Sequence, residues 1–141
     1  MEKLDRPLLI AGALNFIALV PALVLMQADD RALLGVNVWI KPSKFLLSIG
    51  IYLVTLAWML PRLRMGRGLY AGLRWTFILT MIGEIALIAM QSGRGVTSHF
   101  NTATPFDAAV FSAMGTMIGV NTIAALVLLL RFLFTPDPTM P

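Results

Sequence analysis

The chain has 141 residues, of which 58% are hydrophobic and only 13% are charged, and its mean hydropathy is +0.83. A water-soluble domain carries about 25% charged residues, so this composition excludes an ordinary soluble protein and indicates a surface that faces lipid. The net charge is +4, but the basic residues lie in short loops and not along a basic helix, which argues against nucleic acid as a partner.

Four apolar runs of about 20 residues predict four transmembrane α-helices, at residues 7–27, 39–60, 70–90 and 106–134. None of these runs alternates polar and apolar residues with period two, as a membrane β-strand would. The predicted fold is therefore an all-α integral membrane four-helix bundle, with residues 1–134 as a single transmembrane domain. The proline-rich residues 135–141 cannot continue the last helix and are predicted to form a disordered tail.

The basic residues of the loops predict the orientation of the chain. The second loop carries four arginines and no acid, at Arg62, Arg64, Arg67 and Arg74. Such a loop is typical of the cytoplasmic side, so both termini are predicted to be cytoplasmic. Lys41, Lys44 and Arg94 lie at the opposite membrane face, against this rule, and therefore need another reason.

Polar residues within the apolar runs predict which helix faces point inward, because a polar side chain in lipid is costly. They recur at helical spacing on the second and third runs: Lys41, Lys44, Ser48, Tyr52 and Thr55, then Thr80, Glu84, Gln91 and Arg94. Asn15 and Asn121 add one inward residue each to the first and fourth runs.

Glu84 is the only acidic residue in the middle of an apolar run. Matching depths on antiparallel helices places it about one turn deeper than Lys44, within reach of the lysine side chain, so a Lys44–Glu84 pair is predicted. Glu84 is then either a structural acid that fixes the register of the bundle or part of a ligand or ion site. For Lys41 and Lys44, the alternative is that they extend to lipid headgroups.

The third loop, residues 91–101, is the densest polar segment, and its two glycines allow a folded turn. His99, the only histidine, has three interpretations: an axial haem ligand, a proton relay or a hydrogen-bonded loop residue. No metal-binding or glycine-phosphate motif accompanies it, so no metal and no cofactor are predicted, with haem at His99 as the alternative. Thr104, Pro105 and Asp107 then form a helix-start pattern.

The fourth run carries a stripe of small residues, at Ser112, Gly115, Thr116, Gly119 and Thr122. Such a stripe lets helices approach closely in lipid, either within the chain or between chains.

Two segments resemble a family of uncharacterised multi-pass bacterial membrane proteins. The first, residues 35–45, reads GVNVWIKPSKF. The second, residues 91–107, contains Arg94-Gly95, Ser98-His99-Phe100-Asn101 and Thr104-Pro105-Phe106-Asp107. The resemblance covers about residues 28–134 and corresponds to the amino-terminal half of the family, whose members often continue into further helices with additional histidines. It implies membrane topology and a bacterial origin, and therefore a multi-pass protein of the bacterial inner (plasma) membrane, and it carries no catalytic role.

These observations predict a small membrane protein with a polar, partly cationic site in its extracytoplasmic half, which binds a polar or anionic ligand or an ion. The predicted ligand-binding residues are Lys44, Glu84, Gln91, Arg94, His99 and Asn101. The alternative is a structural accessory subunit of a larger membrane complex, or a homo-oligomer in the bilayer, as the small size and the small-residue stripe suggest. A membrane-embedded enzyme is a third hypothesis, without a recognisable nucleophile–base pair, so no catalytic residue is assigned.

Overall fold

The computed structural model describes residues 4–134, and the tail predicted at residues 135–141 lies outside them. Its elements are α1 (Arg6–Ala28), β1 (Ala32–Leu33), β2 (Val36–Asn37), α2 (Ile40–Met59), the 3-10 turn η1 (Leu60–Arg62), α3 (Arg67–Arg94) and α4 (Pro105–Phe134). The four α-helices, with η1 extending α2, are long and apolar enough to cross a membrane. The prediction of a helical fold with four such helices is therefore confirmed.

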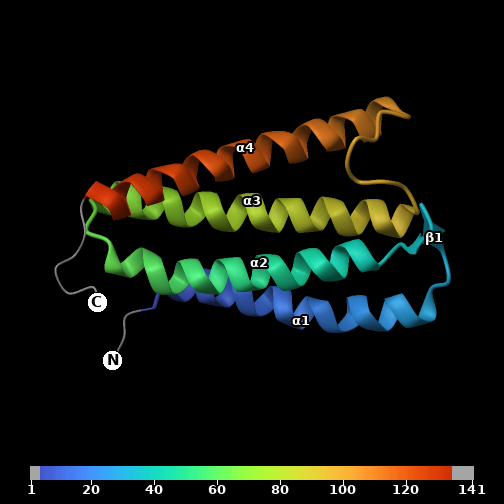
Figure 1. Ribbon diagram of the computed structural model, residues 1–141, viewed down its shortest axis with the longest axis horizontal. Helices are drawn as coiled ribbons and strands as arrows, with labels where there is room; N and C mark the ends of the chain where they lie inside the picture. The colour runs from blue at the N-terminus through green and yellow to red at the C-terminus, as the bar shows by residue number, and fades with distance from the viewer. Residues whose placement is uncertain (1–3, 135–141) are drawn as a thin grey trace.

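The four helices run up and down in chain order (Figure 1). The β1–β2 hairpin and the α3–α4 loop lie together at one end of the molecule, here called the hairpin end, while the α2–α3 connection lies at the other. The main packing joins α1 to α2 and α3 to α4, with α2 against α3 between the two pairs. Within the most apolar stretch of each helix, 44% of residues are buried in α2 and α3 but only 17% in α4. The bundle is therefore open along α4.

α1 and α2 approach each other closely at two glycines that face the partner helix. A Cβ atom at Gly12 would lie 2.8 Å from Val54 Cγ2 and 3.1 Å from the carbonyl oxygen of Gly50. A Cβ atom at Gly50 would lie 2.8 Å from the ring of Phe16. A larger residue at either position would push the two helices apart, so this pair of glycines sets their separation.

The small-residue stripe of α4 does not pack within the chain. All five residues, Ser112, Gly115, Thr116, Gly119 and Thr122, are exposed. A Cβ atom built at Gly115 or Gly119 would meet no atom within 4 Å. The first of the two predicted uses, close packing inside the bundle, is therefore wrong, because α4 turns this face away from α3.

The third helix is longer than predicted, beginning at Arg67 and ending at Arg94 and not spanning residues 70–90. Gly95 ends it in the left-handed conformation, at φ 72°. The Gly95 N–H donates to the Ser92 carbonyl at 3.0 Å, and the Val96 N–H donates to the Gln91 carbonyl at 3.1 Å. This is the Schellman pattern of a glycine C-cap, and it places Gln91 and Arg94 on the last turn of α3 and not in the loop.

At the opposite end, α1 is fixed to α3 through the buried Asp5. Its Oδ1 accepts a hydrogen bond from the N–H of Leu8 at 3.1 Å, which caps α1, and its Oδ2 accepts one from the Tyr70 hydroxyl at 2.6 Å. Arg74 Nη1 lies 3.5 Å from the same Oδ2. Arg74, counted above as a loop residue, is therefore in α3 and contacts an acid.

The hairpin is an element that the apolar pattern did not predict. Leu34 and Gly35 join its two strands with φ 53° and 82°, as a two-residue turn matched to the twist of the strands requires. Asp29 anchors it, since it accepts hydrogen bonds from Arg31 Nη2 at 2.7 Å and from Trp39 Nε1 at 2.8 Å. These donors, Arg31 above all, hold the pKa of Asp29 well below its ordinary value. Arg31 also donates to the carbonyl of Gly93 at 3.0 Å, which ties the hairpin to α3.

Candidate functional site

The structure brings three ionisable side chains together below the hairpin end: Lys41 of α2, Glu84 of α3 and His99 of the α3–α4 loop. Lys41 Nζ lies 2.8 Å from His99 Nδ1, and His99 Nε2 lies 3.5 Å from Glu84 Oε1. Glu84 is 1% exposed. Among the described residues, neither of its carboxyl oxygens has a hydrogen-bond partner. These three residues are referred to below as the Glu84 cluster.

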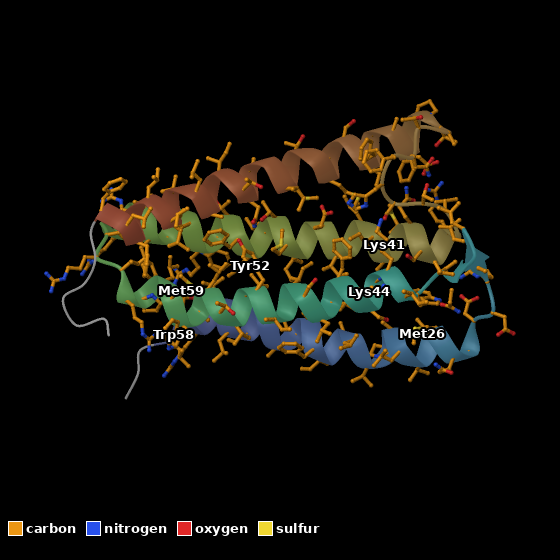
Figure 2. The ribbon with its side chains drawn as sticks, viewed as in Figure 1. Met26, Lys41, Lys44, Tyr52, Trp58 and Met59 are labelled. Atoms are coloured by element: carbon orange, nitrogen blue, oxygen red, sulfur yellow. The ribbon has the colours of Figure 1, made fainter. Side chains whose placement is uncertain are left out.

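Lys44 does not take the place predicted for it. It is exposed, and within residues 4–134 it forms neither an ion pair nor a hydrogen bond with Glu84. Lys41, one turn earlier on the same helix (Figure 2 labels both lysines), instead contacts His99, which lies 3.5 Å from the acid. The predicted Lys44–Glu84 pair is thus wrong, because α2 is rotated so that Lys41, and not Lys44, faces α3.

The contact with Lys41 defines the tautomer of His99, that is, which ring nitrogen carries the proton. A lysine ammonium only donates hydrogen bonds, so Nδ1 of His99 accepts from Lys41, and the ring proton of the neutral imidazole is on Nε2, facing Glu84. Burial, with a smaller contribution from the charge of Lys41, lowers the pKa of His99 below its ordinary value of 6.5. The ring lies between Phe45 and Phe111, at centroid distances of 6.1 and 6.4 Å. A haem iron at either nitrogen would displace Lys41 or Glu84, so the geometry does not favour haem.

Two hollows meet at this cluster. The first, the hairpin-end cavity, has a volume of about 440 Å³ and lies between the hairpin and the α3–α4 loop, with Lys41 and His99 in its lining. The second, the lateral groove, has a volume of about 390 Å³ and lies between α2, α3 and α4, with Glu84 in its lining. Phe45 borders both. The Glu84 cluster therefore separates an end-on cavity from a side-on groove.

The other polar groups of the lateral groove are already hydrogen-bonded. The Tyr52 hydroxyl donates to Asn121 Oδ1 at 3.0 Å, and Asn121 Nδ2 donates to Thr80 Oγ1 at 2.8 Å. The Ser48 and Thr122 hydroxyls donate to backbone carbonyls of their own helices. Among the described residues that line the groove, Glu84 thus offers the unpaired polar atoms.

Gln91 and Arg94 belong to a different network, which joins the end of α3 to the start of α4. The fully buried Gln91 donates from Nε2 to Asp107 Oδ1 at 2.9 Å, and Arg94 Nη1 approaches the same oxygen at 2.6 Å and also donates to Gln91 Oε1. Thr104 Oγ1 donates to Asp107 Oδ2 at 2.7 Å and accepts the Asp107 N–H at 3.1 Å. The predicted helix start at Thr104, Pro105 and Asp107 is confirmed. These four residues, Gln91, Arg94, Thr104 and Asp107, form what is called here the Asp107 clamp.

Asn101 is buried and holds the loop together. Its Nδ2 donates to the Thr97 carbonyl at 3.0 Å, and its Oδ1 accepts the Ala103 N–H at 3.1 Å. Both ends of its amide are therefore used by the backbone of the loop. Its role in the described structure is to shape the segment that presents His99.

The six predicted ligand-binding residues are thus divided among four places. Glu84 and His99 lie together, Gln91 and Arg94 lie in the clamp, Asn101 lies in the loop and Lys44 is exposed. Sequence reasoning missed Lys41, although it stands on the same polar face as Lys44 and only the helix rotation separates the two. Within residues 4–134, no group of three or more His, Cys, Asp or Glu residues could hold a metal ion.

Comparison of the chain with models of known families, with curated proteins and with solved structures finds no match in any of the three. The functional argument therefore depends on the geometry of the Glu84 cluster and its two hollows.

Proposed function

We propose that the chain is a membrane-spanning binding protein whose lateral groove takes an amphipathic ligand from the lipid, with a hydrogen-bond-donating head group on Glu84. The observation that carries this proposal is the pair of unpartnered carboxyl oxygens on a side chain that is 1% exposed. Burying such a group without a partner costs about 1–3 kcal/mol or more. A ligand that donates to Glu84 would offset this cost.

The lining of the groove indicates the chemistry of the ligand. Its walls are mostly apolar, including Phe45, Ile49, Met81 and Ile118, and suit a hydrocarbon body. A hydroxyl or an ammonium head supplies the donor that Glu84 lacks, and an anion does not. The sequence predicted a polar or anionic ligand, and the proposal keeps only the polar class that donates hydrogen bonds. Arg94, a cation expected to attract an anion, is already paired with Asp107.

The proposed test uses a fluorescent dansyl alkylamine as the probe, with the protein in lipid nanodiscs. Glu84→Gln keeps the shape of the side chain and removes its charge, and we expect it to weaken binding at least about tenfold, equal to 1.4 kcal/mol. Asp30→Asn makes the same chemical change at an exposed position and should leave binding unchanged. Equal binding by all three proteins would refute the proposal.

The proposed setting is a bacterial inner membrane, with the hairpin end extracytoplasmic and both termini cytoplasmic. The positively charged α2–α3 connection supports this orientation. Because the chain has no cysteine, single cysteines at the exposed positions Arg67 and Thr102 can be labelled selectively. An impermeant maleimide should label Thr102→Cys in intact cells and Arg67→Cys only after lysis. The reverse pattern would place the site on the cytoplasmic side.

A second candidate function, that of a subunit in a larger membrane assembly, is supported by one observation. The small-residue stripe of α4 faces outward, where a further transmembrane helix could pack closely. Mass measurement of the complex extracted in mild detergent separates the two candidates. A binding protein that acts by itself should run as one or more copies of this chain, whereas a subunit should copurify with a different protein.

A further inference from the structure

The Glu84 cluster lies between the two hollows and contributes side chains to both. Lys41 and His99 line the hairpin-end cavity, and Glu84 lines the lateral groove. Lys41 Nζ and His99 Nδ1 are 2.8 Å apart, and His99 Nε2 and Glu84 Oε1 are 3.5 Å apart. We infer that Lys41, His99 and Glu84 form a proton-transfer path from the hairpin-end cavity to the lateral groove.

In the proposed transfer, each proton that one of the three side chains gives up is accepted by the next. The Lys41 ammonium gives a proton to His99 Nδ1 while His99 Nε2–H gives its proton to Glu84 Oε1. An ammonium, a neutral imidazole and a carboxylate thereby become an amine, the other neutral tautomer of the imidazole and a carboxylic acid. The second distance, 3.5 Å, is slightly longer than a hydrogen bond, so a small rotation of the Glu84 side chain completes the line. A hydronium ion from the solvent then gives a proton to the Lys41 amine and becomes water.

The surroundings favour this route over others. The titratable groups that line the two hollows are Lys41, His99, Glu84 and Tyr52, and the Tyr52 hydroxyl is bound to Asn121. From α4, the group that faces His99 is the neutral ring of Phe111. The Ser98 hydroxyl, 3.1 Å from His99 Nδ1, is a neutral neighbour of the Lys41 contact. The charged pair of the Asp107 clamp, Arg94 with Asp107, is engaged in its own hydrogen bonds.

Such a path would couple ligand binding in the lateral groove to proton exchange at the hairpin-end cavity. An ammonium head on Glu84 favours the carboxylate. While Lys41 is an amine, the Glu84 proton passes to His99 Nε2, and His99 Nδ1–H gives its proton to Lys41, toward the hairpin-end cavity. This coupling depends on the proposed ligand, whereas the arrangement of the path does not. The two claims can therefore fail separately.

The first experiment tests the arrangement of the path without any ligand. Because His99 is the only histidine, ring ¹⁵N-labelled histidine gives the signals of this residue alone. At neutral pH we expect the tautomer with the proton on Nε2. Lys41→Met should shift the Nδ1 resonance, because it removes the lysine that donates to this nitrogen, and Lys44→Met, the matched exposed control, should not. A proton on Nδ1 in the unchanged protein, or identical spectra for all three proteins, would overturn the inference.

The second experiment tests transfer, using the dansyl alkylamine after a rapid change of pH. Loss of the relay in His99→Phe should slow the change in probe binding at least about tenfold, in line with the contribution of a positioned proton carrier. The final level of binding should be kept, which a merely structural defect would not allow. Equal rates in the unchanged protein and His99→Phe refute the path. Failure of Glu84→Gln to weaken probe binding refutes the proposed ligand instead, leaving the tautomer result to decide the path.

Discussion

The Glu84 cluster and the Asp107 clamp are two polar groups near the same end of the molecule, and they differ in how completely their atoms are paired. In the clamp, both Asp107 oxygens accept hydrogen bonds and the buried Gln91 has partners on both sides of its amide. In the cluster, Glu84 is as deeply buried as Gln91 but leaves both oxygens without a partner. A fully paired network stabilises the fold, whereas an unpaired buried acid costs stability and is expected where a ligand binds.

The largest loss of stability is expected when the amide at the centre of the Asp107 clamp is removed. Gln91→Leu keeps most of the side-chain volume but loses the hydrogen bonds to Asp107 and Arg94. We expect the free energy of unfolding to fall by about 2–4 kcal/mol, because bonds to charged partners contribute about 1.5–3 kcal/mol each. Thermal unfolding in one detergent measures this, with the exposed Gln27→Leu as control. Equal stability of the two variants would mean that the clamp does not hold α4.

A smaller loss of stability is expected when the pH is lowered. The pKa of His99 is lower in the folded protein than its ordinary value of 6.5, so the unfolded chain binds the proton more readily. The stability that the neutral imidazole contributes is complete above pH 6.5 and is lost as the pH falls below that value. The melting temperature should therefore decline between pH 7 and pH 5, and this part of the decline should vanish in His99→Phe. An unchanged pH profile in the variant would contradict a neutral, half-buried imidazole.

The smallest stability effect is expected at Glu84 itself. Glu84→Gln replaces one buried polar group that has no hydrogen-bond partner with another of the same shape, so the free energy of unfolding should change by less than about 1 kcal/mol, in either direction. The variant should nevertheless lose probe binding, which separates function from folding. A loss of stability as large as that of Gln91→Leu would show that Glu84 is a structural acid, the other interpretation of its sequence pattern.

The helices could be predicted from the sequence because the length of an apolar run is a direct requirement of the bilayer. The predicted ranges 7–27 and 106–134 differ from the observed ends of α1 and α4 by one residue each at most. The third range was too short because helices continue beyond their apolar part, until a cap such as Gly95 stops them. The hairpin was missed because strands of two residues are too short to show any alternation.

The site could be predicted only in part, because apolar runs fix the depth of a residue and not the rotation of its helix. Three residues along a helix change the direction of a side chain by about 60°. This difference decided between Lys44, which was predicted to meet Glu84, and Lys41, which lies beside His99. The pairing of Gln91 and Arg94 with Asp107 was likewise not visible, since it depends on how the α3–α4 loop folds back.

Because the bundle is open along α4, this helix is held mainly at one end and near its middle. The Asp107 clamp fixes the start of the helix, and the hydrogen bond from Tyr52 to Asn121 fixes it near its middle. The helix from Pro105 to Phe134 has 30 residues and is about 45 Å long, so a rotation of 5° about the clamp moves the far end by about 4 Å. Ile118, Asn121 and Thr122 of α4 form one wall of the lateral groove. A rotation of α4 about the clamp would therefore change the width of the groove, and it would have to break the two side-chain hydrogen bonds of Asn121, to Tyr52 and to Thr80.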